Sequence, residues 1–389
     1  MAFGYESIVE KSFEKFEEIY TWVERENQTL VRIPILGYLK HGGQFLDDEY
    51  FGDEQTAFRF NYSGIRSLCS CLGIRLDVLE KLETQNLSTE VLNDLLAQRS
   101  IQDKLKTLEL IIDESENMIL GIVSKSYVGY SNYQFLNDIK SLLCQKNNDL
   151  SFESGYSINT QLNLRFTLKK KVGVIKGIGG KGKDVTNLGF QFKNSMVGNS
   201  SVNINFFLLR MICTNGLVVP AGLAVNRIFH SGKQNSFSKR LEKAFGEITR
   251  RIGQAGKMVE QLGGLEFNPE FLARMNCSDM IFDIIPGLKG NIVDTYKIKR
   301  TPNNGNMKKN KIMRETQIIN LVPNLIGGKY SQQVFSSGFR DNASMFDFIN
   351  IFTEAAKDMT PAKELETEEK SGILANWIAK NKRKFNTLS

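Results

Sequence analysis

The stretch VTNLGFQFKNS, Val185–Ser195, decides how the centre of this chain folds. Its apolar side chains Leu188, Phe190 and Phe192 recur at every second position, which is the period of a β-strand with one buried face. The segment before it, VIKGIGGKGKD, has the spacing of a nucleotide-binding P-loop. A P-loop enters a helix, whose N-terminus binds phosphate. Here Asp184 replaces the expected Ser or Thr and a strand follows, so we predict a hairpin with a basic tip.

Composition indicates a globular protein that works without a metal or cofactor. The 389 residues are 41% hydrophobic and 24% charged, and no apolar run is long enough to span a membrane. The five cysteines show no disulfide or metal-ligand spacing, and no signal peptide is evident, so we expect a cytoplasmic location. With only two histidines, His41 and His230, we predict no catalytic residue.

Charge is strongly segregated along the chain. Residues 1–120 carry 12 Lys and Arg against 22 Asp and Glu, whereas the rest carries 38 against 21. Two segments, Arg165–Lys183 and Lys297–Arg314, each hold seven basic residues and no acidic one. Such density favours phosphate binding over a merely solvated loop. The predicted nucleic-acid contacts are Arg165, Lys169, Lys170, Lys171, Lys176, Lys181, Lys183, Tyr130, Arg250, Arg251, Lys297, Lys299, Arg300, Lys308, Lys309, Lys311 and Arg314.

Periodicity predicts an α+β protein: an antiparallel sheet with a basic hairpin and a long helix, preceded by a mostly helical region. Alternation in QLNLRF and NINFFL indicates a sheet with one solvated face. We expect long helices over residues 5–26 and 236–262 and a last one near residues 344–357. The predicted parts are an acidic N-terminal region (1–115), a basic α+β core (116–360) and a charged tail (361–389). A seam on the first helix predicts self-association or packing within its own chain: Val9, Phe13, Phe16, Tyr20 and Val23.

The motif order resembles the phage/plasmid-like protein family, catalogued as domain of unknown function 932. The resemblance rests on LGIVSKSYVGYSNYQFLNDI (residues 120–139), RMICTNGLVV (210–219), RIFHSG (227–232) and DNASMFDFINIFTEAAKD (341–358), and it spans most of residues 59–358. It implies an origin on a phage or plasmid and supplies no activity. The family-motif residues, expected to be structural, are Arg210, Cys213, Asn215, Gly216 and His230.

The chain departs from the family pattern at one place. Where Asn-Ser-His-Asp-Gly-Ser is expected, residues 194–200 read NSMVGNS, so any chemistry of that His-Asp pair is lost. The curved sheet, basic hairpin and basic helix are also similar to Rad52-like single-strand annealing proteins. We therefore expect sequence-independent binding of single-stranded DNA, assisted by stacking tyrosines. Two alternatives stay open: binding of an acidic host protein, and an enzyme that uses His230 beside Cys213 or Asn215.

Overall fold

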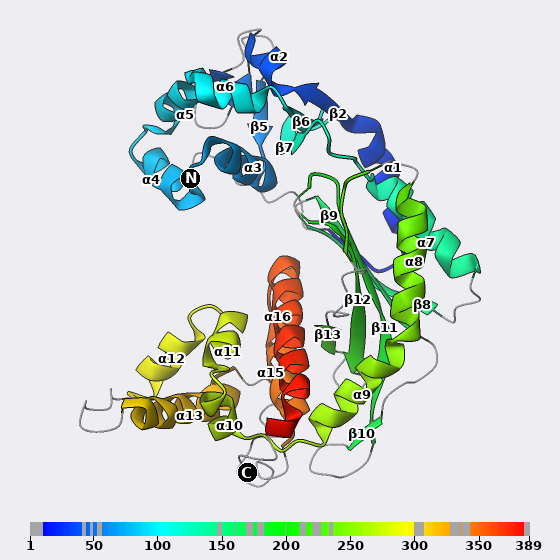
Figure 1. Cartoon of the computed structure of the whole chain (residues 1–389), viewed down its shortest axis with the longest axis vertical. Coiled ribbons are helices and arrows are strands. Elements are labelled where there is room, and N and C mark those ends of the chain that lie inside the picture. Colours follow the sequence, from blue (N-terminus) through cyan, green and yellow to red (C-terminus); the bar gives the residue numbers. More distant parts are fainter. Residues whose placement is uncertain are drawn as a thin grey trace.

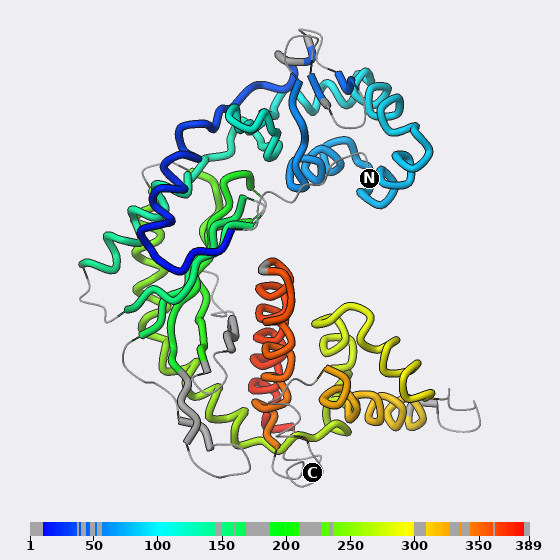
Figure 2. The backbone as a smooth tube through the Cα atoms, turned by 180° about the vertical axis from the view of Figure 1, so that it is seen from behind, coloured from blue at the N-terminus to red at the C-terminus, as the bar shows by residue number. Residues whose placement is uncertain are grey.

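The computed structural model confirms the α+β class. It describes residues 11–40, 44–46, 50–52, 57–145, 150–158, 160–168, 174–176, 183–198, 200–210, 215–219, 227–232, 236–298, 307–326, 335 and 343–384. The elements follow an open arc, with an N-terminal lobe at one end, a long sheet along its back and a group of helices at the other end (Figures 1 and 2). Within these residues, none of the helices combines the length and apolar character needed to cross a bilayer.

The N-terminal lobe contains more helix than strand, as predicted, and it is built on a six-stranded sheet. In spatial order its strands are β2 (Leu30–Pro34), β6 (Leu108–Asp113), β7 (Met118–Ser124), β5 (Ala57–Phe60), β4 (Tyr50–Gly52) and β3 (Gln44–Phe45). The lobe's helices are α2 (Ile35–Lys40), α3 (Tyr62–Leu72), α4 (Leu76–Thr84), α5 (Ser88–Ala97) and α6 (Arg99–Leu105). The predicted boundary at residue 115 is wrong, because it falls between β6 and β7, which pair with each other.

The long central sheet contains the deciding strand. Its order is β1 (Lys11–Phe13), β8 (Leu150–Ile158), β9 (Gln161–Leu168), β11 (Lys183–Ser195), β12 (Val202–Arg210) and β13 (Asn215–Val219), with β10 (Val174–Lys176) on β11 and β14 (Arg227–Ile228) on β12. The described strand pairs of this sheet are all antiparallel. The strand predicted over residues 185–195 is confirmed. A P-loop would require a helix at this position, and the structure has the strand β11 instead.

One face of the central sheet carries the hydrophobic core. Leu188, Phe190 and Phe192 are buried there against α1 (Phe16–Thr29), α7 (Asn132–Gln145), α8 (Phe237–Arg250) and α9 (Ile252–Gly263). The predicted first helix is shorter than expected, because Lys11–Phe13 pairs with β8 as a strand. The single helix predicted over residues 236–262 is also wrong: it breaks at Arg251, which leaves helical geometry with φ −101° and ψ 4°.

The remaining helices complete the other end of the arc. They are α10 (Pro269–Arg274), α11 (Ser278–Ile284), α12 (Leu288–Thr295), α13 (Met307–Ile326), α15 (Met345–Ala356) and α16 (Pro361–Lys380). The predicted helix near residues 344–357 is α15, and Ser344 forms a capping box with Asp347 at its start. Most of the segment predicted as a charged tail is α16, which buries Leu374, Ala375 and Ile378 in the same core as the sheet.

Candidate nucleic-acid interface

The first basic segment is described only in part. Lys169, Lys170, Lys171 and Lys181 lie outside the described residues. Lys176 and Lys183 are Cα partners at the end of the antiparallel β10–β11 pair, so the hairpin backbone sets two lysines opposite each other.

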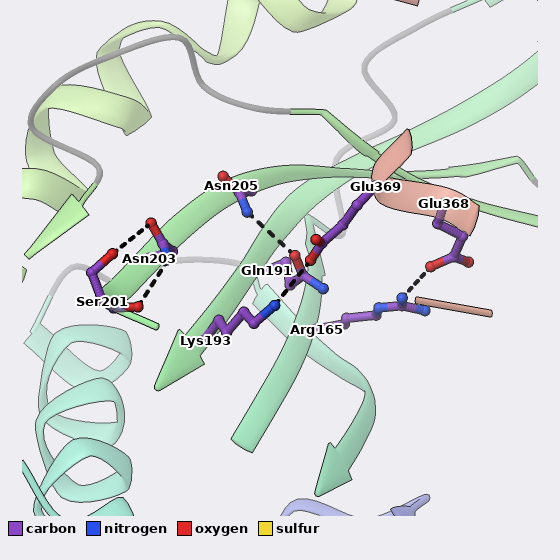
Figure 3. Close-up of polar contacts among 8 residues, drawn as sticks. All are labelled: Arg165, Gln191, Lys193, Ser201, Asn203, Asn205, Glu368 and Glu369. Carbon is purple, nitrogen blue, oxygen red and sulfur yellow. Dashed lines mark hydrogen bonds and ion pairs between the residues drawn. The ribbon is translucent and has the colours of Figure 1, made fainter. Parts of the chain in front are cut away.

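Arg165 is not a phosphate contact, which corrects the prediction. Its side chain is 3% exposed and forms an ion pair with Glu368 of α16, which is equally buried (Figure 3). The guanidinium also lies 5.2 Å from the ring centre of Tyr156 and 4.8 Å from that of Phe207. Burial raises the pKa of the Glu368 carboxyl, and the positive charge of Arg165 opposes that rise. Arg165 therefore joins the sheet to α16.

The face of the sheet that alternation predicts to be solvated is largely covered. Asn163, Arg165 and Gln191 are each at most 3% exposed. At the edge of this polar layer, Lys193 pairs with Glu369 at 3.5 Å, and Asn205 donates to the side chain of Gln191 (Figure 3). Acidic and polar residues of α16 thus meet a polar sheet face.

Tyr130 is also wrongly predicted as a base-stacking residue. It is fully buried and stacks on Phe237 with ring centres 4.6 Å apart. Its hydroxyl donates to the carboxylate of Asp138, and burial raises its pKa. Tyr127 and Tyr133 are half-buried and packed against core clusters.

The break between α8 and α9 exposes a group of basic side chains. Arg250 and Arg251 at the break are exposed, and so is Lys257 one and a half turns further on. The helix α9 contacts β10, so these cations lie at the same end of the sheet as the hairpin (Figure 1). We call Arg250, Arg251 and Lys257 the junction cations.

The second basic segment is in part a helix, which corrects the prediction of a loop. Lys308, Lys309, Lys311 and Arg314 all belong to α13, whereas Lys299 and Arg300 lie outside the described residues. Lys297, Lys309 and Lys311 are exposed and Arg314 is half-buried.

Sequence reasoning missed two large exposed side chains in this region. Tyr296 is 40% exposed at the end of α12, and Met313 is 60% exposed on α13. Tyr296 could have been singled out from the sequence, because it directly precedes the second basic segment. Figure 1 places α13 across the lower half of the molecule from β10, so these two described parts of the basic segments lie apart.

Three of the quoted motifs converge behind the end of β11. Asn194, which is fully buried, donates to the backbone oxygen of Tyr130 and to the side chain of Asn132, both at 2.8 Å. Asn132 in turn donates to Glu26 of α1 at 3.0 Å. The Tyr127 hydroxyl donates to the backbone oxygens of residues 195 and 196, and its ring stacks on His230 at 5.0 Å.

His230 has a structural environment. Burial lowers its pKa to about 4, so the ring is neutral at pH 7, and its Nδ1 lies 3.3 Å from the backbone oxygen of Val128. Asn215 pairs with Arg210 on β12, whereas Arg227 pairs with Asn203. Those two β12 positions are seven residues apart, which is about 23 Å of strand. A site that joins His230 to Asn215 is therefore excluded, and Cys213 lies outside the described residues.

Comparison with known proteins gives one match, to the central part of the chain. Residues 119–274 match the family described as Domain of unknown function (DUF932). This DUF932 segment contains the motifs at residues 120–139, 210–219 and 227–232 but ends before the one at 341–358. No curated protein and no solved structure matches the chain at a significant level. The similarity to Rad52-like proteins has no support.

The described residues expose cations, and two of their buried cysteines have raised thiol pKa values. They contain no group of three or more His, Cys, Asp or Glu side chains placed to hold a metal ion. Burial raises the pKa of Cys69 to about 11 and that of Cys277 to about 12, which keeps both thiols protonated. The exposed cations can attract an anionic partner.

Proposed function

We propose that this protein binds single-stranded DNA without sequence preference, at the end of the central sheet where the hairpin and the junction cations lie. The observation that carries the proposal is the exposure of Arg250, Arg251 and Lys257 at the α8–α9 break and on α9, the helix that contacts β10. Clustered exposed cations attract the phosphate backbone, whatever the base sequence.

A single strand suits this surface better than a duplex. A helix that reads duplex DNA lays a continuous basic face in the major groove. Here the helix breaks at Arg251, and the acidic residues Glu242, Glu247 and Glu260 interrupt the basic face. Discontinuous cations fit a flexible strand that bends between them.

Self-association through the first helix is less well supported. Phe13 and Val23 are buried in the core of their own chain, and Phe16 and Tyr20 pack against it. Val9 lies outside the described residues. The proposal therefore treats a single chain as the binding unit.

Fluorescence anisotropy with a labelled oligothymidine across a salt series tests the proposal. We expect the triple variant Arg250→Gln, Arg251→Gln, Lys257→Gln to bind more weakly and to reduce the salt slope by about 2, at roughly 0.7 per phosphate contact. The matched control is Lys81→Gln, Arg99→Gln, Lys104→Gln, which removes three exposed cations from the N-terminal lobe. It should bind like wild type, and both variants should keep the wild-type melting temperature.

Two other results discriminate between the possible partners. Equal losses in both triple variants would show only a general charge effect and contradict the proposed surface. If wild type binds no DNA or RNA at low salt but binds an acidic polypeptide such as polyglutamate, the acidic-protein reading replaces ours.

A further inference from the structure

A polar pocket of about 470 Å³ lies between the N-terminal lobe and the DUF932 segment. Pockets of this size commonly hold small ligands. Its wall is made by α3 on one side and by the ends of β7 and β11 on the other. The lining residues are Tyr62, Ser63, Arg66, Ser67, Ser70, Cys71, Ile122, Val123, Ser124, Tyr127, Gln161, Val197 and Gly198.

The α3 wall presents one positive charge among hydroxyl groups. Tyr62, Arg66 and Ser70 are spaced four residues apart and share a helix face, with Ser67 beside them. The Arg66 guanidinium lies 5.6 Å from the ring centre of Tyr62. Among the described residues no carboxylate pairs with Arg66, and no other lining residue is charged. The pocket therefore has a net positive charge and favours an anionic ligand.

The opposite wall is held in place by packing and hydrogen bonds. Val123 and Val197 are buried there in one cluster, against which Tyr127 packs. Tyr127 is fixed by two hydrogen bonds from its hydroxyl and by stacking on His230. Gly198 has φ +76°, and a Cβ there would lie 3.3 Å from the Tyr127 ring. The turn at Gly198 thus lets the backbone approach Tyr127 closely, and the wall is formed before a ligand enters.

We propose that this pocket binds one nucleotide unit. Arg66 and the serine hydroxyls would bind the phosphate, because a guanidinium forms paired hydrogen bonds with phosphate oxygens. The base would lie against the aromatic ring of Tyr62. This chemistry is shared by a free nucleoside monophosphate and by one nucleotide of a bound strand. The inference is independent of the junction cations, which lie at the opposite end of β11.

Titration calorimetry on the full chain tests the pocket with three separate probes. They are an equimolar mixture of the four deoxynucleoside 5′-monophosphates, the same mixture of the four nucleosides, and inorganic phosphate. We expect the monophosphates to bind and both other probes to bind about tenfold more weakly. Arg66→Gln should lower affinity about tenfold by removing the charged contact, and Ser70→Trp should abolish binding by filling the pocket. Arg99→Gln removes an exposed arginine of the same lobe outside the pocket and should have no effect.

A second arm uses oligothymidine, so that the two sources of the nucleotide are distinguished. If free monophosphates fail but the strand binds more weakly to Arg66→Gln and Ser70→Trp, the pocket holds a nucleotide of the strand and the proposal stands. If both variants bind every probe like wild type, or if inorganic phosphate binds as well as the monophosphates, the proposal is wrong. Loss of strand binding in the junction variant alone leaves the pocket result unaffected, so the two proposals fail separately.

Discussion

Glu26 is a residue of α1 whose carboxylate reaches the DUF932 segment through Asn132 and Asn194. Burial raises its pKa to about 8, although the hydrogen bond from Asn132 lowers it. The folded state therefore retains a proton that the unfolded chain releases near its ordinary pKa of 4.5. The stabilisation from this proton is complete below the unfolded pKa and is lost as the pH rises through about 8.

Stability should consequently fall between pH 5 and pH 8. We expect the loss from Glu26 to be about 1–3 kcal/mol, because the side chain is only partly buried. Glu26→Gln keeps the oxygen that accepts from Asn132 and removes the titration, so its urea midpoint should change less over this range. An unchanged pH dependence in Glu26→Gln would show that other groups are responsible.

The Arg165–Glu368 pair gives a second prediction at this scale. Arg165→Met should cost about 3–5 kcal/mol, because it leaves a buried carboxylate without its partner. The double variant Arg165→Met, Glu368→Leu should recover most of that loss, since it removes both charges. Urea unfolding of the two single variants and the double variant measures the coupling. Additive losses would contradict a direct interaction.

At the scale of strands and helices, we expect the close approach of β9 and β11 to be easily disrupted by a side chain larger than glycine. A Cβ on Gly189 would overlap the carbonyl oxygen of Phe166 on β9, whereas one on Gly253 of α9 would meet nothing within 4 Å. Gly189→Ala should therefore cost about 3 kcal/mol or more. Gly253→Ala should gain about 0.5–1 kcal/mol through helix propensity. Thermal unfolding of this pair checks the prediction, and equal shifts would contradict it.

Strands with a clear alternation were predictable from sequence, and contacts between polar surfaces were not. Leu188, Phe190 and Phe192 mark the buried face of β11 by their period alone. The position of helix α16 could not be predicted in this way. Its Glu368 is buried against the sheet, and hydrophobic periodicity does not predict a contact between two polar surfaces. Arg165 was wrongly predicted as a nucleic-acid contact for the same reason. Its place in a basic segment does not reveal that it pairs with Glu368, which is far away in the sequence.

At the scale of the whole molecule, α16 is an integral part of the fold. A chain that ends at Thr360 loses the apolar side chains of Leu374, Ala375 and Ile378 and leaves Arg165 unpaired. We expect this truncation to abolish cooperative urea unfolding followed by circular dichroism. A chain that ends at Lys384 keeps α16 and should unfold like the full chain. Wild-type cooperativity in the shorter chain would show that α16 is dispensable.

The shared core also constrains how the protein is made. Ile19 and Leu374 belong to one hydrophobic cluster but are 355 positions apart in the chain. At about 5–20 residues per second, a ribosome needs roughly 20–70 s to synthesise the chain between them. Once its strands are made, the nascent sheet has an uncovered polar face until α16 is synthesised. We therefore expect newly made chains to be most prone to aggregation in that interval.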